Sequence, residues 1–185
     1  MSDRAGATLW FTGLSGAGKT TIAEIVGPEL ERRGQLVEYL DGDVVRTHLS
    51  KGLGFSKEDR DTNIGRIGWV ASRFTRAGVV TLVSAISPYA DTRAAARGMV
   101  EEFGPFVEIF VDTSVEECAN RDVKGLYAKA FSGEIKEFTG VSDPYEAPES
   151  PEIHIATESQ TPEESAALVI AELEARGLIG RAVTA

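Results

Sequence analysis

Short apolar runs alternate with longer amphipathic segments along the chain, and this alternation predicts five strands separated by helices. The expected strands are rich in apolar or β-branched residues and cover 8–12, 36–40, 79–85, 106–111 and 152–156. Strands that alternate with helices in this way are typical of an α/β fold with a mainly parallel sheet. Ligands of such sheets bind beyond the carboxyl ends of the strands. Three segments at strand ends are therefore the ones to examine for chemistry: 13–20, 41–43 and 84–88.

Capping signals place the helix boundaries. Ser56 and Thr161 are expected N-caps, and Ser114–Glu117 has the form of a capping box. The Gly27-Pro28 pair is expected to kink or split the first helix, which runs to about Arg33. Three glycines mark expected helix ends: Gly34, Gly78 and Gly177.

A chain of 185 residues with 42% hydrophobic residues is expected to form one domain, residues 1–185, with a two-sided core. No apolar run approaches membrane-spanning length, and residues 1–7 lack the apolar core of a signal peptide. A cytoplasmic location is therefore the default expectation. Cys118 alone cannot form an internal disulfide, and the two histidines stand apart, so the sequence indicates no His/Cys metal cluster.

The net charge of −10 argues against nucleic acid or an acidic membrane surface as a partner. Cations in the first third of the chain nevertheless gather near one glycine-rich loop or just beyond it: Lys19, Arg46, Lys51, Lys57, Arg60 and Arg66. In an acidic chain, such a concentration is expected where a polyanionic small molecule binds.

The glycine-rich loop has the spacing of a phosphate-binding loop: glycine, four residues, glycine, lysine and a hydroxyl residue. Glycines let main-chain N–H groups point into one anion-sized hollow, and the following helix adds its positive end. Lys19 is expected to reach the outer phosphates of ATP, and the Thr20 hydroxyl to hold Mg²⁺. A Gly/Ser-rich turn that fits the pattern by chance is the alternative. The expected ATP contacts are Gly13, Leu14, Ser15, Gly16, Ala17, Gly18, Lys19, Thr20 and Thr21.

Asp41-Gly42-Asp43 places two carboxylates at the end of the second expected strand. They suit Mg²⁺ binding and proton acceptance beside ATP or, equally well on spacing alone, a helix N-cap and a solvated turn. Four later residues favour the first interpretation: Arg46, Phe55, Arg60 and Asn63. Two arginines and an aromatic ring suit a nucleotide-like second substrate, which has an acidic group and a base to stack upon.

The sequence resembles adenylylsulfate kinase in order over nearly the whole chain. The phosphate loop is shared by many enzymes, whereas the later motifs together are specific. The motifs are Gly-Leu-Ser-Gly-Ala-Gly-Lys-Thr at 13–20, Asp-Gly-Asp at 41–43 with Arg46, Leu-Gly-Phe-Ser at 53–56 with Arg60 and Asn63, Ile-Ser-Pro at 86–88, Lys-Gly-Leu-Tyr at 124–127, Ile-Lys-Glu-Phe-Thr-Gly at 135–140 and Pro-Tyr-Glu-Ala-Pro at 144–148.

The resemblance implies a P-loop NTPase-type fold with a lid, and transfer of the ATP γ-phosphate to the 3′-hydroxyl of adenylyl sulfate during sulfate activation. Lys19 and Thr20 would serve ATP and Mg²⁺, Asp43 would be the base or hydroxyl orienter, and Asp41 would lie nearer the metal. Dimers are common in the family, so a homodimer is a candidate assembly. The residues implied for adenylyl sulfate are Asp43, Arg46, Phe55, Arg60, Asn63, Ile86, Ser87, Lys124, Leu126, Lys136 and Phe138, with the two phenylalanines on either face of its adenine.

The basic, glycine-punctuated segment 121–140 is expected to be the lid. Arg121 is expected against the ATP base, and Lys124, Lys129 and Lys136 would add positive charge over the phosphates. Closing such a lid expels water, which otherwise competes as a phosphate acceptor. A loose pair of surface helices is the alternative, which the clustered glycines and Phe138 disfavour.

Ser87 has two interpretations. Bacterial members of the family carry a serine here that is assigned as a phosphorylated intermediate, whereas direct in-line transfer needs only positioning and charge stabilisation. No base of the usual kind lies beside Ser87 in sequence, so we favour direct transfer with Ser87 in contact with the substrate. The chain departs from the family at Val44, Gly65 and Ala85, where asparagine, arginine and phenylalanine are usual, and these departures leave the substrate affinity open.

Three other functions are alternatives at this point. A small P-loop kinase for a nucleoside monophosphate or a sugar acid would share the loop and the sheet without needing the two phenylalanines. A guanine-nucleotide switch needs an Asn/Thr-Lys-x-Asp motif, which does not follow the fourth expected strand. A catalytically silent partner of a sulfate-activating complex would be expected to lack one of Lys19, Thr20, Asp41 and Asp43, all of which are present.

Overall fold

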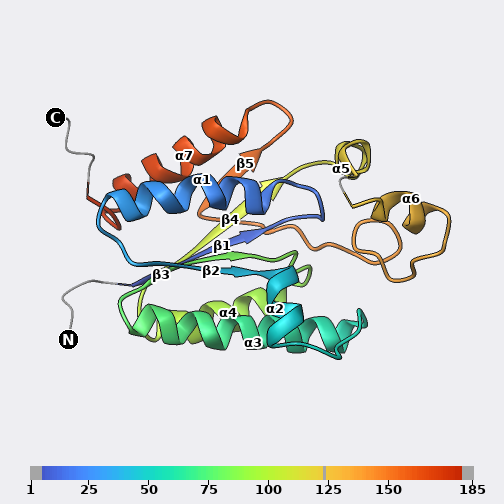
Figure 1. The fold of residues 1–185 in the computed structure, drawn as a ribbon, viewed down its shortest axis with the longest axis horizontal. Coiled ribbons are helices and arrows are strands. Elements are labelled where there is room, and N and C mark those ends of the chain that lie inside the picture. The colour runs from blue at the N-terminus through green and yellow to red at the C-terminus, as the bar shows by residue number, and fades with distance from the viewer. Residues whose placement is uncertain (1–5, 123, 181–185) are drawn as a thin grey trace.

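Five parallel strands form one sheet at the centre of the molecule, in the order β2-β3-β1-β4-β5 (Figure 1). The structure is a computed structural model, and it describes residues 6–122 and 124–180. The all-parallel sheet with helices between its strands confirms the predicted fold class, and each strand lies within two residues of its expected position. The strands are β1 (Ala7–Thr12), β2 (Val37–Asp41), β3 (Val80–Ser84), β4 (Phe106–Asp112) and β5 (Ile153–Ala156).

Helices cover both faces of the sheet, so side chains of β1 enter two separate apolar clusters. Leu9 and Phe11 belong to the cluster under one helix pair, and Trp10 belongs to the cluster under the other. This alternation follows from the two-residue period of a strand. The pairs are α1 (Lys19–Arg32) with α7 (Pro162–Ala175) on one face, and α3 (Lys57–Arg76) with α4 (Ala90–Glu101) on the opposite face (Figure 1).

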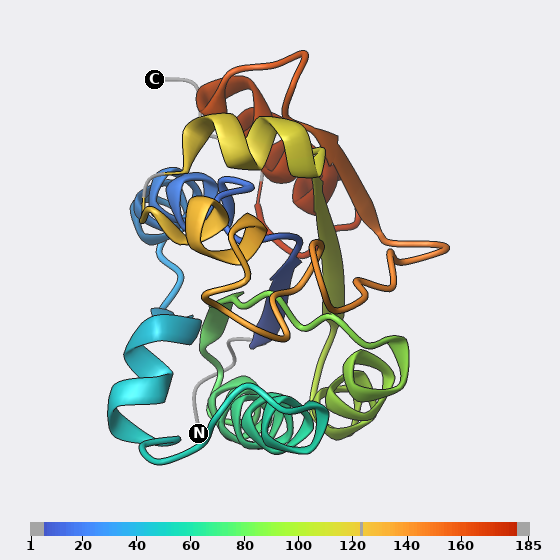
Figure 2. The same cartoon turned by 90° about the vertical axis from the view of Figure 1, so that its right-hand side faces the viewer.

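The shorter helices gather at the carboxyl ends of the strands, the edge that Figure 2 faces. They are α2 (Gly42–His48), α5 (Val115–Arg121) and α6 (Leu126–Phe131). Because β1, β2 and β3 are parallel neighbours, their ends bring the three predicted segments to this one edge, as expected. No helix in the described part of the chain combines the length and the apolar content that a membrane crossing requires.

Most of the predicted capping is confirmed. Ser56 caps α3, and Thr161 forms a complete capping box with Glu164 at the start of α7. Ser114 caps α5, but the predicted reciprocal bond from Glu117 is wrong. The Glu117 carboxylate pairs with Arg121, and the main-chain N–H of Ser114 donates to Glu158 instead. The three expected terminal glycines adopt positive φ angles of 81°, 83° and 69°, at Gly34, Gly78 and Gly177.

Of the two effects predicted for Gly27-Pro28, the split is wrong, because α1 runs unbroken from Lys19 to Arg32 with Pro28 inside it, and the kink stays a prediction. Gly27 has a packing role. A Cβ atom at this position would lie 1.7 Å from the phenol oxygen of Tyr39 on the edge strand β2. The glycine therefore permits the Tyr39 ring to lie against the helix, and this packing accounts for a glycine inside α1.

Candidate functional site

The loop between β1 and α1 has a backbone that only its glycines permit. Gly13 has a φ of 148°, and a Cβ atom there would lie 2.4 Å from the carbonyl oxygen of Val111. Gly18 has a φ of 104° and directly precedes the first residue of α1, Lys19. The loop thus turns tightly between a buried strand and a helix N-terminus, which is the geometry that places main-chain N–H groups around a phosphate.

Lys19 lies along this loop. Its ammonium group donates hydrogen bonds to the carbonyl oxygens of Gly13 and Leu14, at 2.9 and 2.7 Å. Burial lowers the pKa of Lys19 to about 8, against the smaller opposing influence of nearby acidic groups such as Asp41. A buried ammonium of this kind is stabilised by an anionic ligand, because the ligand supplies the charge that solvent no longer supplies.

Thr20 and Asp41 meet at the start of α1, although 21 residues separate them in sequence. The Thr20 hydroxyl donates to Asp41 Oδ2 at 2.8 Å, and Asp41 Oδ1 accepts the main-chain N–H of Asp43 at 2.9 Å. Asp41 is therefore the N-cap of α2 and also a neighbour of the phosphate loop, so both sequence interpretations hold for it. A hydroxyl and a carboxylate are ligands that Mg²⁺ accepts together with phosphate oxygens and water.

The described residues contain no group of three or more His, Cys, Asp or Glu side chains that could hold a metal ion by themselves. The Thr20–Asp41 pair fits a Mg²⁺ ion that brings its remaining ligands with it, as a nucleotide-bound ion does. These two residues would hold the ion, and the ion would neutralise charge on the transferred phosphate.

Asp43 projects from the first turn of α2 and pairs with Lys124 of the lid segment. The Asp43 carboxylate is 71% exposed and the Lys124 side chain 58% exposed, so this ion pair is accessible. An accessible carboxylate beside the phosphate loop is placed as a proton acceptor or hydroxyl orienter requires. The pair also joins the second strand end to the lid.

Arg46, in the last turn of α2, forms a cation–π pair with Phe55, with the guanidinium carbon 4.5 Å from the ring centroid. Arg46 also donates to the carbonyl oxygen of Gly54 at 3.0 Å. Burial lowers the pKa of Arg46, although the group stays cationic at any physiological pH. The Phe55 ring is 61% exposed, so one of its faces is available to a ligand.

Arg60 is buried and connects the region of Phe55 to the lid. Its guanidinium donates to the carbonyl oxygen of Phe55 at 2.6 Å, and it also donates to the Glu137 carbonyl oxygen and the Thr139 hydroxyl. It pairs with Asp143 at 3.2 Å. The segments that carry Phe55 and Phe138 are therefore both attached to one guanidinium.

Two neighbouring side chains bear on the predicted acceptor contacts. Asn63 is 5% exposed, and its Oδ1 atom has no hydrogen-bond partner. An unpartnered buried amide oxygen suits a ligand that donates a hydrogen bond. Phe138 is half-buried and meets the Tyr127 ring edge-on, with the centroids 5.0 Å apart.

The lid segment, residues 121–140, contains α6 and is attached to the phosphate loop; residue 123 lies outside the described residues. The Tyr127 hydroxyl donates to the carbonyl oxygen of Ser15 at 2.8 Å. Arg121 pairs with Glu117 and places one terminal nitrogen 3.5 Å from the carbonyl oxygen of Ala17. Leu126 begins α6, whereas Lys136 is exposed between α6 and Phe138.

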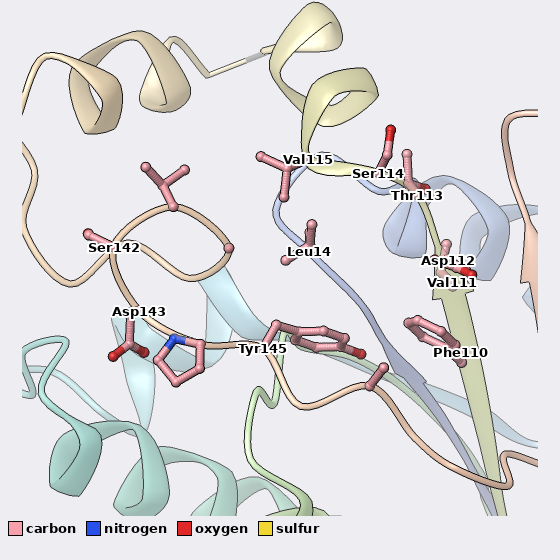
Figure 3. Close-up of a pocket in the computed structure, with 14 residues that line it drawn as sticks. Leu14, Phe110, Val111, Asp112, Thr113, Ser114, Val115, Ser142, Asp143 and Tyr145 are labelled. Carbon is pink, nitrogen blue, oxygen red and sulfur yellow. The ribbon is translucent and has the colours of Figure 1, made fainter.

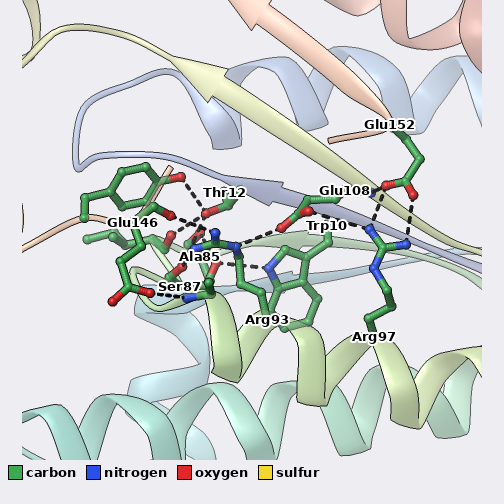
Figure 4. A network of polar contacts seen from close by, with 12 residues as sticks. Trp10, Thr12, Ala85, Ser87, Arg93, Arg97, Glu108, Glu146 and Glu152 are labelled. Carbon is green, nitrogen blue, oxygen red and sulfur yellow. Dashed lines mark hydrogen bonds and ion pairs between the residues drawn. The ribbon is translucent and has the colours of Figure 1, made fainter. Parts of the chain in front are cut away.

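Ser87 is buried, and protein groups already engage its hydroxyl (Figure 4). The indole N–H of Trp10 donates to Ser87 Oγ at 3.0 Å, and the Ser87 hydroxyl lies 3.3 Å from the Ala85 carbonyl oxygen that accepts from it. No carboxylate or imidazole is among these partners. Ile86 is held by the Thr12 hydroxyl, which donates to its carbonyl oxygen at 2.7 Å. This arrangement favours a binding role for Ser87 over a nucleophilic one.

Sequence reasoning missed the residues that support this strand end: Trp10, Thr12, Arg93 and Tyr145. The three departures from the family pattern lie in different surroundings. A Cβ atom at Gly65 would meet nothing within 4 Å, Val44 is exposed on α2, and Ala85 is buried beside Gly42.

A cavity of about 640 Å³ opens on the β4 side of the phosphate loop (Figure 3). Leu14, the end of β4 and residues 140–145 line it, together with Val115 and Ala147. It contains none of the residues predicted for the acceptor. We therefore place the chemistry at the strand ends described above, where the charged groups and the phosphate loop converge, and regard this cavity as a neighbour of the site.

Comparison with known proteins identifies the family. The model of the family described as "Adenylylsulphate kinase" matches residues 5–156. The chain belongs to the adenylylsulfate kinase family. The adenylyl-sulfate kinase of Rippkaea orientalis is 56% identical over 178 residues, which cover 96% of this chain and 97% of that protein. Members of this family are ATP-dependent phosphotransferases, and the chain is an enzyme of this type.

Solved adenylylsulfate kinase structures have the same fold. The Mycobacterium tuberculosis APS kinase CysC, solved in complex with AMPPNP and APS, aligns with a TM-score of 0.89 at 43% identity, covering 92% of this chain and 99% of that one. The hexameric APS kinase from Thiobacillus denitrificans aligns with a TM-score of 0.75 at 39% identity, covering 96% of this chain and 30% of that one. The resemblance in the later motifs is thus confirmed at the level of the family.

Proposed function

We propose that the chain transfers the γ-phosphate of MgATP to the 3′-hydroxyl of adenylyl sulfate, giving 3′-phosphoadenylyl sulfate and ADP. One observation carries the proposal beyond family membership. The phosphate loop with its Thr20–Asp41 pair lies at the same sheet edge as the buried arginine that connects Phe55 to the lid. A donor nucleotide and an acceptor nucleotide can therefore lie end to end across the strand ends.

On the donor side, the loop residues 13–21 bind the ATP phosphates, and Lys19 exchanges its two carbonyl partners for phosphate oxygens. Thr20 and Asp41 would hold Mg²⁺, and the bound ion would supply positive charge beside the phosphates. Arg121 lies against the ATP base, which places that base beside Ala17 and the start of the lid.

On the acceptor side, Asp43 accepts or orients the 3′-hydroxyl proton, for which its exposed carboxylate must leave Lys124. Lys124 is then free to bind phosphate oxygens. Arg46, Arg60 and Asn63 bind the ribose and the phosphosulfate end, with Asn63 Oδ1 accepting from the ligand. Phe55 and Phe138 stack on the adenine. The remaining contacts are Ile86, Ser87, Leu126 and Lys136.

The experiment is coupled ADP release with adenylyl sulfate as the sole acceptor, in the parent enzyme and in Asp43→Asn. We expect activity in the parent and a loss of roughly a hundredfold or more in the variant, the usual scale for a positioned base. Asp91→Asn is a matched control, because Asp91 is an exposed carboxylate in the first turn of another helix, α4. ADP release with AMP or gluconate, and none with adenylyl sulfate, would contradict the proposal and favour a kinase for another acceptor.

Three further parts of the proposal concern the whole protein. Residues 1–185 form one kinase domain that works in the cytoplasm, the enzyme needs Mg²⁺, and two copies associate as a homodimer. Light scattering on the purified enzyme tests whether it is a homodimer. Removal of Mg²⁺ with EDTA, followed by its return, tests whether activity needs the ion.

A further inference from the structure

Arg93 lies under the acceptor side of the site, on the buried face of α4, with its side chain 4% exposed. Each of its three guanidinium nitrogens has a different partner (Figure 4). Nε donates to Glu108 Oε1 at 2.8 Å, one terminal nitrogen donates to the Ser87 carbonyl oxygen at 2.8 Å, and the other donates to the Glu146 carbonyl oxygen at 2.7 Å. Only Glu108 among these three partners contributes a charged group. The other two nitrogens of this buried cation donate to carbonyl oxygens of loops.

The loops that Arg93 joins are the acceptor loop, defined here as residues 85–89, and the strap, residues 143–147. Further bonds run between them. The Glu146 N–H donates to the Pro88 carbonyl oxygen at 2.8 Å, and the Ala90 N–H donates to the Glu146 carboxylate at 2.7 Å. The Tyr89 hydroxyl donates to Asp143, the same carboxylate that pairs with Arg60. Arg93 therefore lies between the acceptor loop and the strap. The strap is in turn connected to the lid through the Asp143–Arg60 pair.

Backbone conformation supplies an independent argument. Among the described non-glycine residues, φ reaches the left-handed region only at Ser87, where it is 44°, and at Glu137, where it is 54°. Such a conformation costs free energy and persists only where the surroundings enforce it. In both cases the carbonyl oxygen of the residue accepts a hydrogen bond from a buried arginine: Arg93 for Ser87 and Arg60 for Glu137.

We propose that Arg93 is a positioning residue for the acceptor: it holds Ile86 and Ser87 in the strained conformation that faces the second substrate, and it ties that loop to the strap. The inference rests on the proposed function. Lysine at this position keeps the charge, but a single ammonium does not reproduce the planar fork that reaches three separated acceptors. Replacing the guanidinium therefore releases the loop while Glu108 retains a cationic partner.

Arg97 is the matched control, because it lies one turn further along α4 and belongs to the same ionic network (Figure 4). It donates to both carboxylate oxygens of Glu152 at 2.8 Å and lies 3.6 Å from Glu108. Its other partners are Glu101 and the Phe106 carbonyl oxygen, all outside the acceptor loop and the strap. A purely structural role for the network predicts similar consequences at the two arginines.

The test compares Arg93→Lys with Arg97→Lys through the KM for adenylyl sulfate, the KM for MgATP, kcat and the melting temperature. We expect Arg93→Lys to reduce kcat/KM for adenylyl sulfate about tenfold or more while the KM for MgATP changes less than about twofold. Arg97→Lys should lower the melting temperature without altering either KM. Equal losses for both substrates in Arg93→Lys, or an acceptor kcat/KM like the parent's, would overturn the proposal.

A second variant covers the case in which Arg93→Lys does not fold, and a second readout tests Arg93→Lys without kinetics. Glu108→Gln removes the charge that orients Arg93, and it should raise the KM for adenylyl sulfate; an unchanged KM counts against the proposal. Trp10 donates to Ser87 and stacks on Phe106, so in a Trp69→Phe background the fluorescence of the remaining tryptophan reports surroundings that include the acceptor loop. An emission spectrum that Arg93→Lys leaves at the parental position would also overturn the proposal.

The two proposals fail in different ways. If the parent enzyme phosphorylates another acceptor instead of adenylyl sulfate, the proposed function fails, and the same variants are then compared with that acceptor. If the parent phosphorylates adenylyl sulfate and Arg93→Lys behaves like Arg97→Lys, only the role of Arg93 fails.

Discussion

The donor half and the acceptor half of this site are built in different ways. The donor half is one contiguous segment, residues 13–21, whose shape follows from glycine backbone angles and a helix N-terminus. The acceptor half is assembled from separate elements by long-range polar contacts, such as the bonds of Arg60 to residues 77 and 79 positions away. Local backbone geometry therefore fixes nucleotide binding, whereas the choice of acceptor depends on a few buried side chains.

The largest effect is expected for Lys19→Met in the donor half. Removing a cation aimed at the transferred phosphate should reduce kcat/KM for MgATP by roughly 10²–10³, as loss of one transition-state donor does in other enzymes. Steady-state kinetics measures this, and Lys51→Met, an exposed lysine outside the loop, is the control. A Lys19→Met enzyme with turnover close to that of the parent would show that the ammonium has no part in transfer.

Arg60→Met should damage the acceptor half while leaving MgATP binding unchanged. The substitution leaves Asp143 without its buried partner, which should lower the free energy of unfolding by about 3–5 kcal/mol and raise the KM for adenylyl sulfate. Urea unfolding and kinetics measure the two consequences. Lys57→Met on the same helix removes an exposed ion pair with Asp61 and a cation–π contact with the Tyr89 ring, and it should cost much less stability. Equal stability losses in the two variants would refute the distinction.

Ser87→Ala should have a smaller effect on turnover, because direct transfer needs no serine nucleophile. The variant leaves the buried Trp10 N–H without an acceptor, so we expect a stability loss of about 1–3 kcal/mol and near-normal kcat. Trp10→Phe removes the other member of the bond, and the double variant should lose less than the sum of the single losses. Abolished turnover, together with a phosphoenzyme trapped in the parent, would establish the covalent route instead.

The smallest expected effect is a pH dependence of MgATP binding. Burial holds the pKa of Lys19 at about 8 in the free enzyme, and bound phosphates raise it by favouring the ammonium. The complex then binds more protons than the free enzyme above pH 8, so MgATP binding should take up a fraction of a proton there and weaken as the pH rises. At pH 6.5, where Lys19 is protonated in both states, no uptake is expected. Calorimetry in buffers of different ionisation enthalpy measures the difference, and uptake that does not depend on pH would exclude Lys19 as its source.

The same contrast explains what the sequence could predict. The sequence predicted the phosphate loop, the Asp41–Asp43 pair and most helix caps, because each depends on residues close together in the chain. The family motifs indicated candidate acceptor residues, but the contacts that these side chains make could not be predicted from the sequence. Arg60, predicted as a substrate contact, has protein partners on each of its guanidinium nitrogens, and with Asp143 those partners lie in three separate segments.

The residues that support the acceptor loop were harder to predict from the sequence. Arg93 lies four positions after Tyr89, which places a cation on the face of α4 that packs against the sheet. A charged residue on a buried helix face is the one signal that could have indicated the network, but its partners Glu108 and Glu146 are 15 and 53 residues away. The missed role of Gly27 has a similar cause, since only the folded chain brings Tyr39 against it.

The Tyr127 hydroxyl makes the position of the lid segment depend on the conformation of the phosphate loop. Because α6 is attached to the Ser15 carbonyl, a nucleotide that rotates that peptide group also pulls on the helix. The position of α6 is therefore coupled to the conformation of the phosphate loop through a single tyrosine hydroxyl.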